Sequence, residues 1–311
     1  MTNSYNFDDI DPIDDEVIPL SRDLRRASDT MGRDEARFLV DQYYGVQKVR
    51  KATTEQIRSI ENPKTGSGEP HDMLTHTLGN LRKMESQIVA TLTRYTDNHA
   101  LSQWSKSICG IGPVLSAGLL AYIDTDTASS PAGVWRFAGY DPTAEWKKGE
   151  KRPHNGDLKT LCWKIGESFQ KVCNNPKDFY GHMYQDRKAY ESPKNEAGDY
   201  ADQAQRQLEI KNYKKDTDAY KAYIQDKLPL GHLDERAKRH ATKIFLSHYW
   251  EAGRTLKCPC GKCPSMDLPK DWEPWVIAIG GHQDRIPVPN LPMQTPVPIF
   301  HPEDLKDKKV A

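Results

Sequence analysis

The sequence predicts a mainly α-helical fold, with a helical arm, a helix-hairpin-helix core, a small cysteine-rich knuckle and flexible termini. Three observations lead to this prediction. Apolar residues recur at helical spacing over about 33–60, 71–97 and 232–254. A Gly-Ile-Gly turn joins two further helical patterns near residue 110. Three cysteines stand close together after the last of the long helices.

The two N-terminal helices are separated by the loop 62–70, which is rich in Gly, Pro and Ser. They can pair as a hairpin, a common dimerisation device, so a homo-oligomer stays open, although plain helical packing is the simpler interpretation. The polar stretch 174–230 indicates an inserted helical arm, and six prolines between 287 and 302 favour an extended tail. The expected segments are an acidic flexible arm (1–30), a helical hairpin (31–97), the helix-hairpin-helix core (98–173), a polar helical insertion (174–230), a closing helix with the cysteine knuckle (231–265) and a Pro-rich tail (266–311).

Charge is distributed unevenly along a chain whose formal net charge is +0. Residues 1–30 hold eight acids against three arginines, a net charge of −5. Residues 146–173 hold seven bases against three acids, and 211–243 hold nine bases against five acids, so each of these stretches carries +4. Each run taken alone is most simply a solvated helix face. A neutral total therefore neither indicates nor excludes a nucleic-acid partner.

Several features bear on localisation. No apolar run reaches the length of about 18 residues that spans a bilayer, so no membrane partner is expected. The acidic N-terminus lacks the apolar segment of a secretory signal. The six cysteines, three of them clustered, do not have the spacing of a disulfide framework. These features favour a reducing, cytoplasmic compartment.

The turn Gly110-Ile111-Gly112 is the most informative segment. Two glycines around an apolar residue permit a tight turn whose backbone can approach another molecule closely. Pro113 suits the first turn of the next helix, whose N-terminal amides and dipole favour a phosphate ligand. A helix-hairpin-helix grips a nucleic-acid backbone in this way without reading bases. The alternative is a glycine-rich turn between two core helices.

A basic loop follows at 146–159, with Trp146 inside it and Trp163 just beyond. Its cations can contact phosphates, and its aromatic rings can stack on bases or pack in the core. Packing is the simpler role for the two tryptophans. The basic and polar residues of the loop that we take as candidates are Lys147, Lys148, Lys151, Arg152, His154, Asn155 and Lys159.

The order of these short motifs resembles the C-terminal domain of the DEDD-type insertion-sequence transposases, the family that includes the RNA-guided recombinases. The resemblance covers about 98–172 and 232–254, about a third of the chain. It implies a DNA-binding helix-hairpin-helix, and RNA stays open as a further partner. The matching pieces are Cys109-Gly110-Ile111-Gly112-Pro113, Phe137-Ala138-Gly139-Tyr140-Asp141-Pro142, Lys148-Gly149, His154-Asn155-Gly156-Asp157-Leu158-Lys159 and the helix from Leu161 to Phe169.

The chain departs from that family in its catalytic parts. The family carries a catalytic serine before the glycine that Gly149 matches, and here Lys148 stands in its place. The family's N-terminal nuclease domain holds a quartet of metal-binding acids between strands, and residues 1–97 show no strand pattern. We therefore expect a DNA-binding, transposase-like protein of a mobile element or phage. Two alternatives are an active recombinase whose catalytic groups lie elsewhere, and a helical interaction scaffold that binds no DNA.

The cysteine cluster Cys258, Cys260 and Cys263 has the density of a small zinc knuckle. Zinc takes four ligands, and the fourth can come from His248 on the preceding helix or from His282. The role expected for such a zinc ion is structural, because no glutamate base stands nearby at the spacing of a metalloenzyme. The alternative is three reduced cysteines after the end of a helix.

Overall fold

A computed structural model describes residues 21–147, 149–256 and 286–291. The fold is mainly helical, as the sequence predicts, and no strand occurs in these ranges. The chain divides into two compact units, Met1–Asn98 and His99–Ala311. None of the helices in these ranges combines the length and hydrophobicity that crossing a membrane requires.

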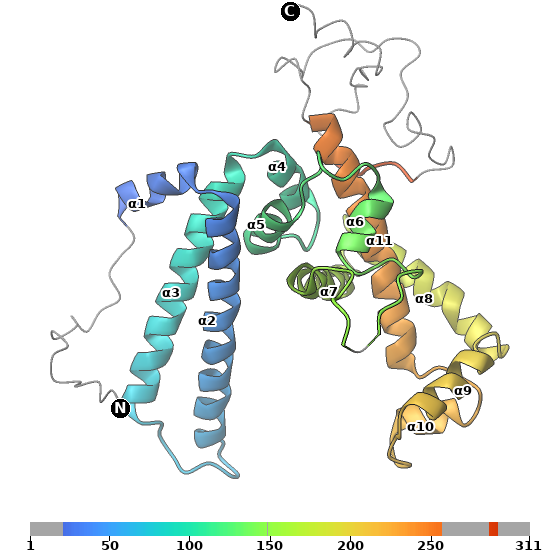
Figure 1. Ribbon diagram of the computed structural model, residues 1–311. Helices are drawn as coiled ribbons and strands as arrows, with labels where there is room; N and C mark the ends of the chain where they lie inside the picture. Colours follow the sequence, from blue (N-terminus) through green and yellow to red (C-terminus); the bar gives the residue numbers. More distant parts are fainter. Residues whose placement is uncertain (1–20, 148, 257–285, 292–311) are drawn as a thin grey trace, which may run out of the picture. The chain divides into compact units, whose positions relative to one another are not determined.

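The first unit is built around a long helical hairpin (Figure 1). Its elements are α1 (Arg22–Ala27), the 3-10 helix η2 (Ser28–Thr30), α2 (Arg33–Ile60) and α3 (Asp72–Asp97). Val40 and Ile57 of α2 are buried, as are Leu78 and Leu92 of α3. The predicted pairing of these two helices follows from this apolar spacing.

A polar contact centred on Glu85 interrupts the apolar seam of the hairpin. Arg50 of α2 forms an ion pair with Glu85 of α3, and Gln47 also reaches Glu85 at 3.3 Å. Burial of Glu85 would raise the pKa of its carboxyl group, but the hydrogen bonds from Arg50 and Gln47 outweigh burial and lower it. The contact fixes the register of the two helices, because a shift along either helix would leave a half-buried charge without its partner.

The end of the predicted acidic arm is helical, because residues 22–30 form α1 and η2. Asp29 accepts a hydrogen bond of 2.8 Å from Asn98 and pairs with Arg94 of α3. The hydrogen bond from Arg94 is the main reason that the pKa of Asp29 lies below its usual value. Residues 1–20 lie outside the described ranges.

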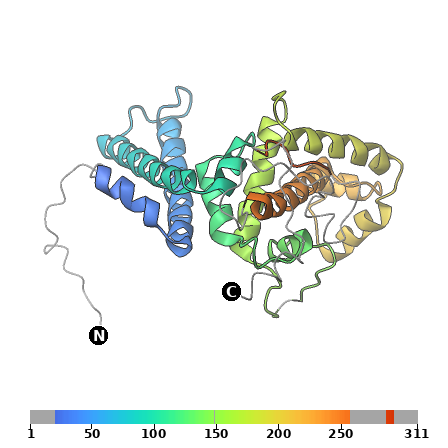
Figure 2. The same ribbon diagram turned by 90° about the horizontal axis from the view of Figure 1, so that it is seen from above.

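The second unit is arranged around its last helix, α11 (Leu230–Leu256), which packs against α4, α6, α7 and α8 (Figure 2). Its core is aromatic: Trp104 stacks on Phe245, and Phe169 stacks on Tyr180. The other helices are α4 (Ala100–Ser107), α5 (Pro113–Tyr122), α6 (Pro131–Phe137), α7 (Gly156–Val172), α8 (Tyr180–Glu196), α9 (Ala201–Ile210) and α10 (Asp218–Tyr223).

The polar stretch after α7 is helical, forming α8, α9 and α10. A small second core of Ala204, Tyr223, Leu228 and Leu233 holds α9 and α10 against the start of α11. At its base, Asn195 makes two hydrogen bonds with the backbone of Leu228: its amide nitrogen donates to the carbonyl at 2.9 Å, and its oxygen accepts from the amide at 2.8 Å.

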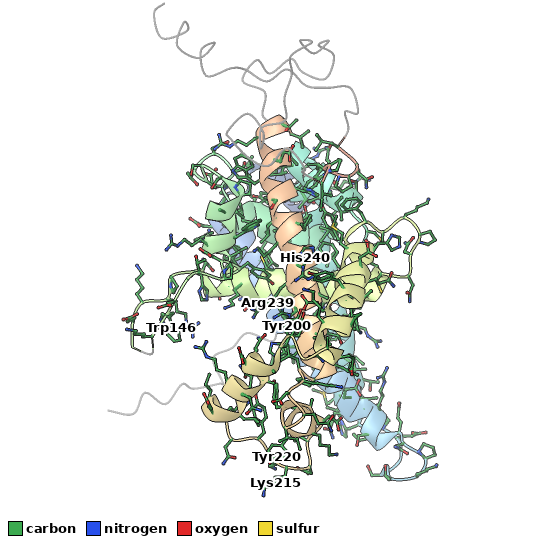
Figure 3. All side chains as sticks on the ribbon, turned by 90° about the vertical axis from the view of Figure 1, so that its right-hand side faces the viewer. Trp146, Tyr200, Lys215, Tyr220, Arg239 and His240 are labelled. Atoms are coloured by element: carbon green, nitrogen blue, oxygen red, sulfur yellow. The ribbon has the colours of Figure 1, made fainter. Side chains whose placement is uncertain are left out.

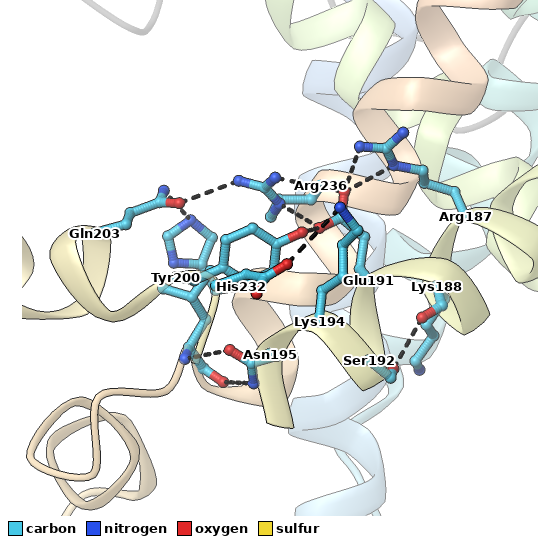
Figure 4. Close-up of polar contacts among 12 residues, drawn as sticks. Arg187, Lys188, Glu191, Ser192, Lys194, Asn195, Tyr200, Gln203, His232 and Arg236 are labelled. Carbon is cyan, nitrogen blue, oxygen red and sulfur yellow. Dashed lines mark hydrogen bonds and ion pairs between the residues drawn. The ribbon is translucent and has the colours of Figure 1, made fainter. Parts of the chain in front are cut away.

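A buried carboxylate ties α8, α9 and α11 together (Figure 4). Glu191 has a side chain with no exposed surface, and it accepts from Arg187 at 2.7 Å, from Arg236 at 3.0 Å and from the hydroxyl of Tyr200. Burial would raise the pKa of Glu191, but these hydrogen bonds outweigh it and lower the pKa. Glu191 is therefore charged and structural.

Candidate nucleic-acid interface

The hairpin that the sequence predicts lies between α4 and α5. Gly110 has a φ of +87°, in the left-handed region that favours glycine, and so permits the tight turn. Ile111 is buried, and its amide donates to the carbonyl of Ile108 at 3.0 Å. Gly112 is exposed and is the N-cap residue of α5, and Pro113 occupies the first turn of that helix.

In the described part of the chain, backbone amides without an acceptor lie at the start of α5 and not at Ile111 in the turn itself. The amide of Ile111 is already bonded within the turn. Within the described ranges, no acceptor contacts the amides of Gly112, Val114 or Leu115. Of these residues Gly112 is exposed and Val114 is buried. The surface of the hairpin thus centres on Gly112 and the N-terminus of α5.

The other face of the turn is packed against α7. The hydroxyl of Ser168 donates to the carbonyl of Gly110 at 2.6 Å. A Cβ atom at Gly110 would stand 2.9 Å from that hydroxyl and 3.2 Å from Cγ2 of Val172. Nothing lies within 4 Å of a Cβ atom at Gly112. Gly110 is thus needed for packing, whereas Gly112 borders open space.

Three buried serines join the two helices of the hairpin, and none of them was among the residues expected from the sequence. The hydroxyls of Ser105 and Ser116 are 2.7 Å apart, and Ser116 also donates to the hydroxyl of Ser102 at 3.0 Å. All three side chains are buried. The sequence signal that could have identified them is their position within apolar helical segments, because a buried hydroxyl needs a hydrogen-bond partner.

The basic loop stands out from the helices of the second unit, with Trp146 near its tip (Figure 3). Trp146 is 45% exposed, and its indole nitrogen donates to the carbonyl of Glu150 at 2.8 Å. The guanidinium of Arg152 lies 5.8 Å from the centre of the Trp146 ring. Lys147, Lys151 and Arg152 are exposed, and Lys148 lies outside the described residues.

Two polar residues at the end of the loop have structural contacts. The side-chain oxygen of Asn155 caps α7, accepting from the amides of Asp157 at 3.0 Å and Leu158 at 2.9 Å. His154 packs against Gly139, where a Cβ atom would stand 2.9 Å from the imidazole ring. Asn155 thus has a structural role as the N-cap of the helix that follows the loop, and its expected contact with DNA stays a prediction.

A small cavity between α7 and α11 gathers several charged side chains. It has a volume of about 50 Å³ and is lined by Gly139, Tyr140, Lys159, Trp163, Gly166, Glu235, Lys238 and Arg239. Lys238 pairs with Glu167 and with Glu235. Among the described residues, Lys159 and Arg239 form no ion pair.

The cations near this cavity repel one another. Burial, followed by repulsion from Arg239 and Arg152, lowers the pKa of Lys159. Burial, followed by repulsion from Lys159 and Arg152, lowers the pKa of His154. Arg239 was not expected here from the sequence, because it lies on the closing helix far from the basic loop. Only folding brings it beside Lys159.

The hairpin and the cavity lie on opposite sides of α7. Ser168, which contacts the hairpin, follows Lys159 by nine residues. This separation is about two and a half helical turns, so the two side chains point in opposite directions and lie about 13 Å apart along the axis. The candidate residues therefore form two contact regions, one around Gly112 and one around Lys159 and Arg239.

The predicted zinc ligands fall mostly outside what the structure describes, since Cys258, Cys260, Cys263 and His282 belong to the undescribed segment 257–285. His248 is described and lies in the core, 4% exposed. Its Nδ1 is 2.8 Å from the hydroxyl of Tyr180, and its Nε2 is 2.9 Å from the carbonyl of Ile286. As a zinc ligand, His248 would have to give up one of these contacts. Within the described ranges, no cluster of three or more His, Cys, Asp or Glu side chains could hold a metal ion.

Comparison of the chain with protein-family models, with curated proteins and with solved structures gave no match.

Proposed function

We propose that this protein binds DNA by contacting the phosphate backbone, as a transposase-like protein of a mobile element or phage. The observation that carries the proposal is the exposed N-terminus of α5. Gly112 is exposed there, and the amides of Gly112, Val114 and Leu115 contact no acceptor among the described residues. Backbone amides without an acceptor at the positive end of a helix favour binding of a phosphate oxygen, and the exposed Gly112 makes this end accessible.

The basic loop supports the same proposal from a second region. Lys147, Lys151 and Arg152 are exposed and form no ion pair within the described part of the chain. Cations that are not neutralised by the protein release counterions when they meet phosphates, and this release favours binding at low salt. The resemblance of the hairpin and loop to the insertion-sequence transposases points to the same class of ligand.

A matched pair of substitutions at Gly112 tests the proposal. Aspartate and asparagine are both good N-cap residues, and both fit the open space at Gly112. They differ only in charge, so Gly112→Asp places a negative charge where a phosphate would lie. We expect Gly112→Asp to weaken DNA binding and Gly112→Asn to leave it nearly unchanged. Fluorescence anisotropy with a labelled duplex, measured across a salt series, gives both affinities.

The salt series supplies the second criterion. Removing a single phosphate contact should reduce the slope of log affinity against log salt by about one, so the single variants Lys151→Ala and Arg152→Ala should each flatten it. Absence of binding at about 50 mM salt would reject the proposal and favour the helical scaffold that binds no DNA.

A further inference from the structure

The cavity between α7 and α11 combines an exposed aromatic ring with cations that have no carboxylate partner. Trp163 lines the cavity and is 48% exposed. Lys159 and Arg239 line it as well, and neither forms an ion pair among the described residues. An exposed indole ring beside such cations is the combination that binds unpaired nucleotides, because every base has a face that can stack.

The charge in this cavity is not balanced by the protein. Glu235 is the only acid among the lining residues, and it pairs with Lys238 at 2.6 Å. Lys238 also pairs with Glu167. Lys159 and Arg239 therefore present two positive charges to whatever enters. The volume of about 50 Å³ is several times the ~10–15 Å³ that holds one water molecule, and it accommodates a phosphate group.

We propose that this cavity binds the phosphate of an unpaired nucleotide whose base stacks on Trp163. The proposal rests on the DNA-binding function and deepens it, since it assigns single-stranded nucleic acid to this side of α7. Stacked bases within a duplex cannot turn a face toward Trp163, so the site distinguishes unpaired from paired nucleotides. The hairpin on the opposite side of α7 contacts only the backbone and does not make this distinction.

The test compares two ligands and two pairs of variants. A labelled single-stranded oligonucleotide and the duplex of the same sequence are titrated with the full chain. We expect Trp163→Ala to weaken single-strand binding about tenfold, and to leave duplex binding within about twofold. The matched control is Tyr190→Ala, because Tyr190 is 52% exposed on α8, away from the cavity. Arg239→Gln should also weaken single-strand binding, whereas its control Arg206→Gln on α9 should not.

The outcomes separate the nucleotide site from the proposed function. If the protein binds duplex but Trp163→Ala leaves single-strand binding unchanged, the nucleotide site is rejected and the DNA-binding function stands. If Trp163→Ala weakens the binding of both ligands equally, Trp163 has a structural role, and the nucleotide site is also rejected. If neither ligand binds, both proposals fall together.

Discussion

The hydroxyl of Ser168 donates a hydrogen bond of 2.6 Å to the carbonyl of Gly110. This contact joins the hairpin turn to α7. As a result, the two glycines of the turn have different surroundings. Gly110 faces α7 and leaves no room for a side chain, whereas Gly112 faces open space. In the motif Gly110-Ile111-Gly112, the first glycine is therefore required by packing, and the second is exposed.

We expect Gly110→Ala to lower the free energy of unfolding by about 1–3 kcal/mol, because its φ of +87° and the contact with Ser168 both oppose a Cβ atom. Gly112→Ala has an ordinary backbone conformation and no steric conflict, so its effect should stay below about 1 kcal/mol, the part expected because alanine is a poorer N-cap residue than glycine. Urea unfolding measures both. Equal losses in the two variants would show that the turn is not packed against α7 as described.

Substitution of the buried Glu191 should lower the stability of the fold substantially. We expect Glu191→Gln to lower the free energy of unfolding by about 3 kcal/mol, because Arg187 and Arg236 would lose their charged partner. This value is at the lower end for a buried pair, since both guanidinium groups keep some contact with water. The control Glu55→Gln removes an exposed pair with Arg58 and should cost well under 1 kcal/mol. Similar losses for both variants would contradict the structural role of Glu191.

The helix cap at Asn155 can be tested in the same way. Asn155→Ala should cost about 1 kcal/mol, because the amides of Asp157 and Leu158 would lose their acceptor. Asn155→Asp keeps an oxygen in place and should retain most of the stability. A loss of DNA affinity in Asn155→Ala without any loss of stability would contradict the capping role and support the direct DNA contact that the sequence predicts.

Stability should fall as the pH drops below about 6.5, partly because of His240. Burial, followed by repulsion from Arg187 and Lys243, lowers the pKa of His240 in the folded protein. The unfolded chain therefore takes up a proton first, and the stabilisation present above pH 6.5 is lost as the pH falls toward the folded pKa. His240→Gln should therefore reduce the slope of the free energy of unfolding against pH between about pH 5 and pH 7. The same change in slope for the exposed control His76→Gln would argue against this assignment.

Zinc analysis can separate the candidate ligands. If the predicted knuckle binds zinc, Cys258→Ser should lower the metal content of the purified protein. We expect His248→Gln to leave the metal content unchanged, because both ring nitrogens of His248 are engaged by Tyr180 and Ile286. Loss of zinc in His248→Gln, with the fold intact by circular dichroism, would identify His248 as the fourth ligand after all.

The sequence predicted the helical class well because apolar periodicity is a local signal. The long helices α2, α3 and α11 each carry that signal over many turns. The position of the hairpin turn also followed from local residues, since two glycines and a proline define it. The helix over residues 22–30 was missed, because its acids gave no apolar face and its contact with Arg94 is distant in sequence.

The site was harder to predict than the fold because it depends on contacts between distant segments. Arg239 lies about 80 residues after Lys159 and reaches the same cavity only through the packing of α11 on α7. Asn155 illustrates a second difficulty, since its role as the N-cap of α7 could not be told from the sequence of a basic loop. The sequence also does not show that the hairpin and the cavity contact opposite sides of α7, which follows from the nine residues between Lys159 and Ser168 on that helix.

The pair of hydrogen bonds between Asn195 and Leu228 has a consequence for how this protein can vary. The chain leaves the main body after Asn195 and returns at Leu228, so α9 and α10 begin and end at nearly one point. The segment between Asn195 and Leu228 can therefore change in length without changing the distance between α8 and α11. Related proteins should therefore differ in length there more readily than within α7 or α11, and an inserted reporter domain should be tolerated best in the loop between α9 and α10.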